Sequence, residues 1–208
     1  MMKRFFVPLL TMAVLVGLAG WARASGSFED GHRLAVFLDS LDVEHRWPAG
    51  VHVNWETGLP DGRVEKFEGK HTHCSAFVAS AAKQLGVYIL RPPEHNQVLL
   101  ANAQYEWLRD QGTQYGWEPV PDGYEAQRKA NRGFLVVATY MSHNPEKPGH
   151  IAIVRPSGKS RDQLLSEGPE VIQAGETNYR SVSLQVGFSG HPAAWGKQEV
   201  RYYAHDLP

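Results

Sequence analysis

The order of hydrophobic periodicities along the chain is the feature that most restricts its fold. Apolar residues recur with helical spacing in the first half, over residues 27–41, 74–85 and 96–108. Strand-like runs fill the second half, and residues 134–140 and 149–154 are the strongest of them. Helices and strands do not alternate in a βαβ rhythm, so we expect an α+β fold in which N-terminal helices pack on a central antiparallel sheet of about five strands.

Local signals predict where several elements begin and end. Ser27 and Asp30 have the spacing of a capping box for the first helix, and Asn96 is expected to cap the third. Residues 112–123 are expected to form a loop. Three further strands are expected at residues 171–174, 182–188 and 199–204.

The N-terminus predicts an exported protein. Residues 1–4 are Met-Met-Lys-Arg, residues 5–21 are apolar, and Ala-Arg-Ala follows directly before Ser25. This is the pattern of a secretory signal peptide, so we expect removal of residues 1–24 and a single domain over residues 25–208. An uncleaved membrane anchor is the alternative, but the apolar run is short for a span. We therefore expect a periplasmic or secreted bacterial protein with no stable membrane anchor after cleavage.

Charge and cysteine content narrow the function classes. Three of the 21 Lys and Arg residues lie in the predicted signal peptide, which leaves 18 against 22 Asp and Glu. A mildly acidic chain without a basic cluster does not match a nucleic-acid-binding protein. Cys74 is the only cysteine, so no internal disulfide can form. A lone thiol in an exported protein is either buried and inert or used chemically.

Cys74 opens a predicted helix, and this position suits a nucleophile. Free N–H groups and the macrodipole at a helix N-terminus favour a thiolate and lower the pKa of a thiol. His150 begins a predicted strand, from which a histidine can take up the thiol proton and later protonate a leaving amine. Gln173 is a lone polar residue in the next apolar run and can orient the imidazole. Asn178 and Glu176 are the substitutes for this third role.

Four segments in this order resemble the NlpC-type and CHAP-type branches of the papain-like cysteine peptidases and amidases. They are residues 74–78 (Cys-Ser-Ala-Phe-Val), 131–137 (Asn-Arg-Gly-Phe-Leu-Val-Val), 149–154 (Gly-His-Ile-Ala-Ile-Val) and 171–175 (Val-Ile-Gln-Ala-Gly). The resemblance implies a papain-like fold and a cell-wall hydrolase with Cys74, His150 and Gln173 as its catalytic residues. The chain departs from the family pattern at His73, where the family has Asp, and at Gln173, where it has His. The upstream tyrosine of the family has no counterpart here.

Residues near the nucleophile supply further candidates for the site. Substrate contacts are expected from His73, Ser75 and Trp55. We expect no cofactor and no metal. A zinc site built from His71, His73 and Cys74 is the alternative, but it needs a further ligand such as His143 or His150, and no second cysteine supports it.

The sequence thus predicts a secreted cysteine hydrolase that cleaves an amide bond. The resemblance implies peptidoglycan as the substrate, cut in its stem peptide or at the amide link to the glycan. The expected partners are a peptidoglycan fragment or another peptide or amide substrate, with an inhibitor or targeting protein as a further candidate. Two alternatives stay open, a papain-like acyltransferase or transamidase acting on a lipid or protein, and a non-catalytic binding module on the same scaffold.

Overall fold

A computed structural model describes residues 26–64 and 72–208. The predicted signal peptide over residues 1–24 and the candidate ligand His71 lie outside the described residues. The helices are α1 (Phe28–Ser40), α2 (Cys74–Gln84), α3 (Leu100–Asp110), α4 (Gly123–Ala130), α5 (Arg161–Glu167), α6 (Leu184–Gly187), α7 (Pro192–Gly196) and the 3₁₀ turn η1 (Gly112–Tyr115). The strands are β1 (Trp117–Val120), β2 (Leu135–Tyr140), β3 (His150–Val154), β4 (Glu170–Gln173), β5 (Tyr179–Ser183) and β6 (Arg201–His205).

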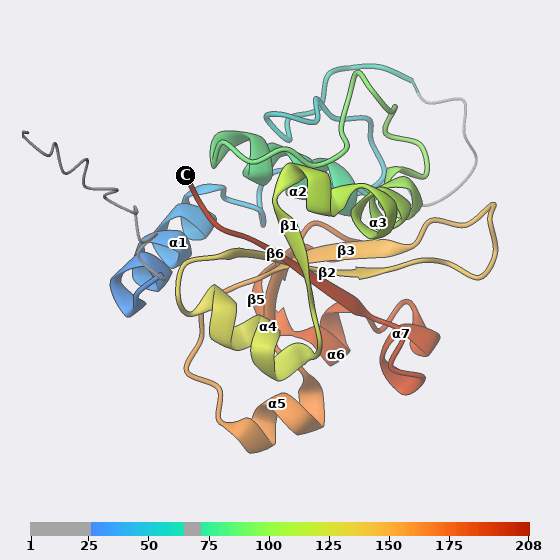
Figure 1. The fold of residues 1–208 in the computed structure, drawn as a ribbon. Helices are drawn as coiled ribbons and strands as arrows, with labels where there is room; N and C mark the ends of the chain where they lie inside the picture. Colours follow the sequence, from blue (N-terminus) through green and yellow to red (C-terminus); the bar gives the residue numbers. More distant parts are fainter. Residues whose placement is uncertain (1–25, 65–71) are drawn as a thin grey trace, which may run out of the picture.

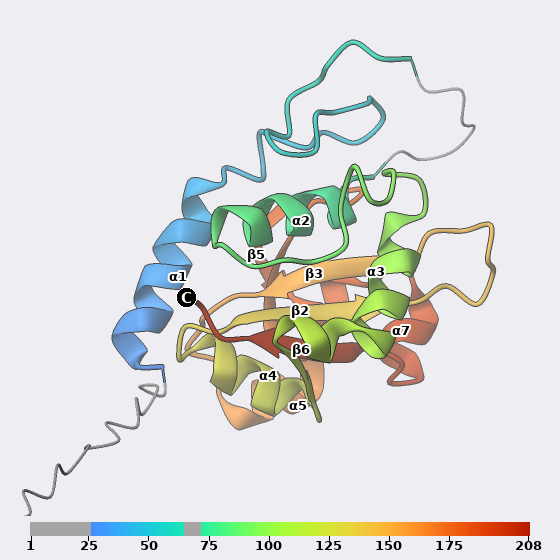
Figure 2. The ribbon, with the colours of Figure 1, turned by 45° about the horizontal axis from the view of Figure 1, so that its top comes forward.

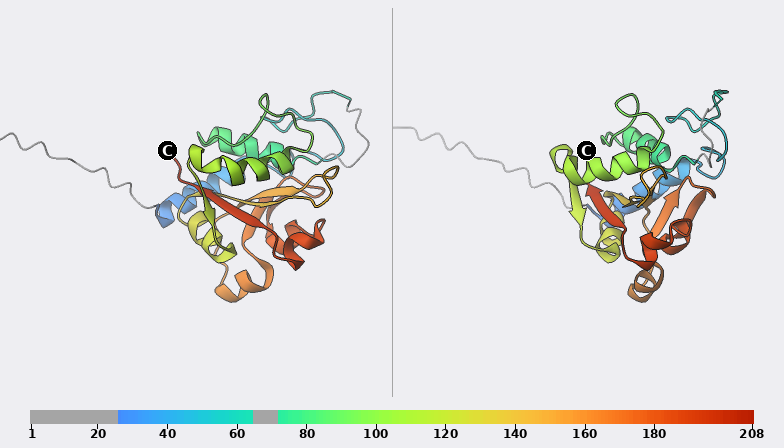
Figure 3. Two further views of the ribbon diagram at one scale, coloured as in Figure 1. Left: turned by 45° about the vertical axis from the view of Figure 1, so that its right-hand side comes forward. Right: turned by 90° about the vertical axis from the view of Figure 1, so that its right-hand side faces the viewer.

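The strands form one antiparallel sheet in the order β1-β6-β2-β3-β4-β5 (Figure 1). Helices α2 and α3 lie on one face of this sheet, and α4 to α7 lie on the other (Figures 2 and 3). The structure therefore confirms the predicted α+β class, with N-terminal helices on an open antiparallel sheet. The sheet has six strands where the sequence predicts about five.

Strands β2 and β3 occupy the middle of the sheet and are buried along their whole length. Leu135, Val137, Ile151 and Ile153 face a core shared with α1, α2 and α3. The alternate residues face a second core, shared with α4, α6 and α7. Burial on both faces explains why the chain reads as nearly continuous apolar runs here, since neither face of these strands meets water.

The caps and composition of the helices explain their positions. Ser27 and Asp30 form the predicted capping box at α1. Helix α2 is rich in Ala and Ser, and every residue from Cys74 to Ala82 is buried. Small side chains allow a helix backbone to lie close to a sheet, so α2 can pack directly over β3 (Figure 2). Its N-terminus, which carries Cys74, is thereby held against the sheet.

Three local predictions are wrong, each for a physical reason. Asn96 does not cap a helix, because its side chain accepts the N–H of Val98 within a turn and α3 begins only at Leu100. The predicted loop over residues 112–123 contains η1 and the edge strand β1. The predicted strand over residues 182–188 ends at Ser183, whose hydroxyl accepts the N–H of Val186 and starts α6.

Within residues 26–64 and 72–208, the helices are too short or too polar to cross a bilayer.

Candidate active site

Cys74 is the first residue of α2, and its side chain is only 3% exposed. The preceding residue, His73, makes no side-chain capping hydrogen bond to the first turn. The N–H groups of that turn have no partner inside the helix, so they can serve an anion or a developing oxyanion.

Burial governs the ionisation of this thiol. Burial raises the pKa of Cys74 above its ordinary value, while the backbone N–H groups of Ile151, Ser75 and Cys74 and the Ser75 hydroxyl lower it. The helix terminus therefore acts in the direction expected from the sequence, but it does not determine the net shift. At rest these surroundings favour the neutral thiol.

His150 is the first residue of β3 and is 5% exposed. Its Nε2 lies 2.8 Å from Oε1 of Gln173, a residue that is itself 3% exposed. The Gln173 amide nitrogen is directed at the carbonyl of Thr177 at 3.5 Å, which is consistent with this orientation of the amide. An amide oxygen only accepts, so Nε2 carries the proton, and Nδ1 of the neutral ring is left as an acceptor.

The surroundings of His150 favour its neutral form. Burial lowers the pKa of His150, and the hydrogen bond with Gln173 raises it by a smaller amount. The ring of Phe188 meets the imidazole edge-on, with the ring centroids 4.6 Å apart. Because burial pushes the pKa of Cys74 upward and that of His150 downward, the resting site holds a neutral thiol and a neutral imidazole.

The pairing of β3 with β4 determines how His150 and Gln173 lie relative to each other. The ladder pairs Ile153 with Ile172 and Val154 with Val171, and the start of β3 lies beyond these pairs. The N–H of Ile151, next to His150, acts on the Cys74 thiol at this end of the strand. Continuing the same register places Gln173 diagonal to His150 on one face of the sheet, a spacing that long side chains can bridge.

The two substitutes for Gln173 have different positions. Asn178 is a structural residue, since its Nδ2 donates to the carbonyls of Val43, Arg46 and Trp47 and its Oδ1 accepts the N–H of Gly175. Glu176 lies in the wall of the pocket next to His150. Among the three predicted orienting residues, Gln173 is the one that is hydrogen-bonded to His150.

Asn102 of α3 lies in no motif that predicts a role at the site. It is buried, and its Oδ1 accepts the N–H of Gly149 at 2.7 Å and that of Ser142 at 3.3 Å. Its Nδ2 donates to the carbonyl of Lys147 at 3.0 Å. A β-carbon on Gly149 would lie 2.6 Å from Asn102 Oδ1, so the glycine permits this close approach. Asn102 thus fixes the connection that leads into His150.

Replacing Asn102 by alanine is expected to lower the free energy of unfolding by about 2–4 kcal/mol, because the buried N–H of Gly149 and the half-buried N–H of Ser142 lose their acceptor. Chemical denaturation measures this loss. Exposed Asn96, whose side chain bonds only within its own turn, provides the matched control, and Asn96→Ala should cost less than about 1 kcal/mol. Equal effects of the two substitutions would contradict the role of Asn102.

A pocket of about 580 Å³ opens beside His150 and Gln173. Glu176 and His191 also line it, and the ring of His191 stacks on that of His150 with centroids 5.6 Å apart and planes 20° apart. Burial, and to a smaller extent the neighbouring His150, lowers the pKa of His191 to about 4. No motif marks His191 in the sequence, since it follows a short Ser-Gly turn and precedes a proline.

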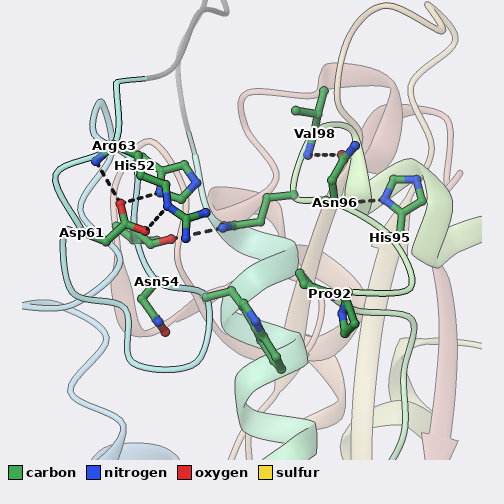
Figure 4. A pocket seen from close by; sticks show the side chains of 12 residues that line it. His52, Asn54, Asp61, Arg63, Pro92, His95, Asn96 and Val98 are labelled. Atoms are coloured by element: carbon green, nitrogen blue, oxygen red, sulfur yellow. Dashed lines mark hydrogen bonds and ion pairs between the residues drawn. The ribbon is translucent and has the colours of Figure 1, made fainter.

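A second pocket, of about 450 Å³, lies between the loops over residues 51–63 and 92–98 (Figure 4). Trp55 lines it, as do His52 and Asp61, which are joined at 2.7 Å. His73 is buried nearby, with its Nε2 2.8 Å from the carbonyl of Val51. Of the three expected substrate contacts, Ser75 therefore lies at the thiol, Trp55 lines this pocket, and His73 anchors a loop.

The alternative zinc site would bring His73 and Cys74 together with a further ligand such as His143 or His150. Residues 26–64 and 72–208 contain no group of three His, Cys, Asp or Glu side chains placed to hold a metal ion. His71 lies outside these ranges, so its contribution is not described.

Comparison with known proteins gives one informative likeness. No protein-family model matches the chain. A curated protein named peptidoglycan amidase Tse1, from Pseudomonas aeruginosa, is 37% identical over 82 residues. The match covers 39% of this chain and 44% of that protein, so the chain spans less than half the length of this relative.

Proposed function

We propose that this protein is a cysteine amidase that hydrolyses an amide bond of peptidoglycan. Cys74 is the nucleophile, His150 is the general base and acid, and Gln173 orients His150. The name of the similar protein supports both the reaction and the substrate. The two candidate classes weighed beside it, acyl transfer and simple binding, become outcomes of the test below.

The hydrogen bond between His150 Nε2 and Gln173 Oε1 is the observation that carries this proposal. It selects the tautomer that a base needs, with Nδ1 unprotonated, and it holds the ring with a neutral acceptor. The thiol of Cys74 interacts with the N–H of Ile151, the residue after His150, and we assign the thiol proton to Nδ1 of His150.

In the first half of the reaction, Nδ1 of His150 takes the thiol proton as the sulfur attacks the carbonyl carbon. The N–H groups of the first turn of α2 stabilise the oxyanion that forms. His150 then gives its proton to the amide nitrogen, the C–N bond breaks, and an amine leaves. The acyl group remains on Cys74 as a thioester.

In the second half, His150 takes a proton from water, and the hydroxide oxygen attacks the thioester carbon. The C–S bond breaks, the sulfur recovers the proton from His150, and a carboxylic acid is released. Because burial favours the neutral forms of both residues, each half-reaction starts and ends with a neutral pair. Gln173 keeps its contact throughout, since Nε2–H is present in both protonation states of the ring.

Export belongs to the same proposal. A signal peptide over residues 1–24 would deliver a single papain-like domain, residues 25–208, to the periplasm or the exterior, where peptidoglycan lies. The lone free thiol then has a use in a compartment where unpaired cysteines are otherwise unusual.

Purified peptidoglycan sacculi test the proposal. The chain over residues 25–208 should release soluble fragments and one new amino group for each bond cut, and mass spectrometry of the products identifies that bond. Products in which an acyl group has moved to an added amine or lipid would indicate an acyltransferase. Binding to sacculi without any product, equal in the wild type and Cys74→Ser, would indicate a binding module.

Replacing Gln173 by leucine is expected to lower kcat/KM by about 10- to 100-fold, because Nε2–H of the buried His150 loses its acceptor at a cost of about 1–3 kcal/mol. Gln173→Glu restores an acceptor and should recover part of the activity. Asn178→Ala is the comparison, since Asn178 bonds to backbone rather than to His150. Asn178→Ala should lower the free energy of unfolding, but it should lower kcat/KM of the folded protein less than Gln173→Leu does. A larger loss of kcat/KM in Asn178→Ala than in Gln173→Leu would contradict the assignment of Gln173.

A further inference from the structure

Two imidazole rings lie together in the pocket beside Gln173. The rings of His150 and His191 stack with centroids 5.6 Å apart and planes 20° apart. His191 comes from the turn before α7, where its N–H donates to the carbonyl of Phe188 at 2.8 Å. The segment over residues 188–191 therefore supplies both rings that contact His150, Phe188 in a T-shaped arrangement and His191 in a stacked one.

His191 faces the pocket rather than the protein interior. It is half-buried, and it lines the pocket together with His150 and Gln173. Within the described residues, neither of its ring nitrogens forms a hydrogen bond, and its other ring contact is with Tyr140 at 5.4 Å. A histidine that only anchored this turn would be expected to use a ring nitrogen for that purpose.

We propose that His191 is a positioning residue for His150: its ring stacks on the imidazole and holds it in the plane set by Gln173. This inference rests on the proposed function of Cys74 and His150. The contact with Gln173 restrains one ring nitrogen, but a ring held at a single atom can still tilt about it. Phe188 blocks tilting at one side, and His191 closes the side that faces the pocket.

The stacked ring has to remain uncharged while His150 carries the proton. Burial holds the pKa of His191 near 4, so its ring is neutral at neutral pH and does not repel the imidazolium. The other titratable groups near this pair are Glu176 after β4 and Tyr179 on β5, which line the pocket, Tyr140 on β2 and, beyond Tyr140, the His143–Glu199 pair. Glu176 is the one Asp, Glu, Lys or Arg residue among those that line the pocket.

Alkylation of the full chain by iodoacetamide tests the inference without any assumption about the substrate. Cys74 is the only cysteine, so the rate of mass gain reports on this thiol alone. His191→Leu keeps a similar volume but removes the flat ring, and His191→Phe keeps the ring but cannot ionise. His32→Leu, on the exposed face of α1, is the matched control.

At neutral pH, His191→Leu should slow alkylation by up to about tenfold, which corresponds to the interaction free energy of a favourable aromatic pair. The pH profile of the alkylation rate should move to higher pH. His191→Phe should stay within about threefold of the wild type, as should His32→Leu. Circular dichroism and thermal unfolding check that all three variants are folded. Equal rates for His191→Leu and the wild type would overturn the inference, as would an equal loss in His191→Phe and His191→Leu.

The observations that would contradict the proposed function differ from those that would overturn the inference about His191. A wild type that alkylates in a His150-dependent manner but leaves sacculi intact contradicts peptidoglycan as the substrate and leaves the comparison of His191 variants valid. If the wild type is alkylated no faster than His150→Gln at any pH, His150 does not activate Cys74. The positioning role of His191 is then overturned as well.

Discussion

Replacing Cys74 by alanine or serine is expected to abolish the hydrolysis of sacculi, with a loss of kcat on the order of 10⁴-fold or more. The chain has no second cysteine that could take over the attack. A serine hydroxyl is a much weaker acid than a thiol, so His150, whose own pKa is lowered by burial, cannot activate it well. Initial rates of amino-group release from sacculi measure the effect.

The stability of these variants separates a catalytic thiol from one that only fills space. Cys74→Ala removes one buried sulfur and should cost about 1 kcal/mol, or about 2–4 °C in Tm for a domain of this size. Cys74→Ser keeps the volume and can accept from the N–H groups that surround the sulfur. A large drop in Tm for both variants, with activity lost only in proportion to the unfolded fraction, would favour an inert core cysteine.

Features of the fold that depend on residues close together in the sequence could be predicted from it. The capping box at Ser27 and the buried strands β2 and β3 are examples, because their signals are local. Strand β1 was missed because its sequence, Trp-Glu-Pro-Val, is a poor strand by itself and exists through pairing with β6, far along the chain. Proline is tolerated there because β1 is an edge strand.

The segment over residues 182–188 shows how one pattern can satisfy two periods. Its apolar residues alternate, which predicts a strand. Leu184 and Phe188 are also four residues apart, and both are fully buried in the second core on one side of α6. The cap from Ser183 and the burial of these two residues stabilise a helix rather than a strand. The helix places Phe188 against His150.

The site was only partly predictable for the same reason. Cys74 and His150 stand out because each opens an element, and Gln173 stands out because it is polar in an apolar run. The hydrogen bond between His150 and Gln173 depends on the register of β3 and β4, which the sequence does not reveal. Asn102 and His191 act across the fold from α3 and from the turn before α7, and no local pattern distinguishes them from ordinary polar residues.

Burial of the pair makes its activity depend on pH in a defined way. If the working form is the neutral pair, activity falls when His150 becomes protonated, and the pKa of His150 is lowered by burial. The acidic limb of kcat/KM should therefore lie below about pH 6.5, the ordinary pKa of histidine. The alkaline limb should lie above the ordinary pKa of a thiol, about 8.5, because burial raises the pKa of Cys74. A preformed thiolate–imidazolium pair holds the same number of protons and would displace both limbs in the same directions. An acidic limb above about pH 6.5 would contradict a His150 whose pKa is lowered by burial.

His150→Gln tests the proposed Cys74–His150 pair by removing the base. At neutral pH this variant should lose about 10²- to 10⁴-fold in kcat/KM, the usual contribution of a general base. Its alkylation by iodoacetamide should also slow at neutral pH, because burial keeps the thiol protonated once the base is gone. At strongly alkaline pH the thiol ionises without help, so the alkylation rates of variant and wild type should converge. A constant ratio of the two rates at every pH would mean that His150 affects only access to Cys74, and the assignment of His150 as the base would then be wrong.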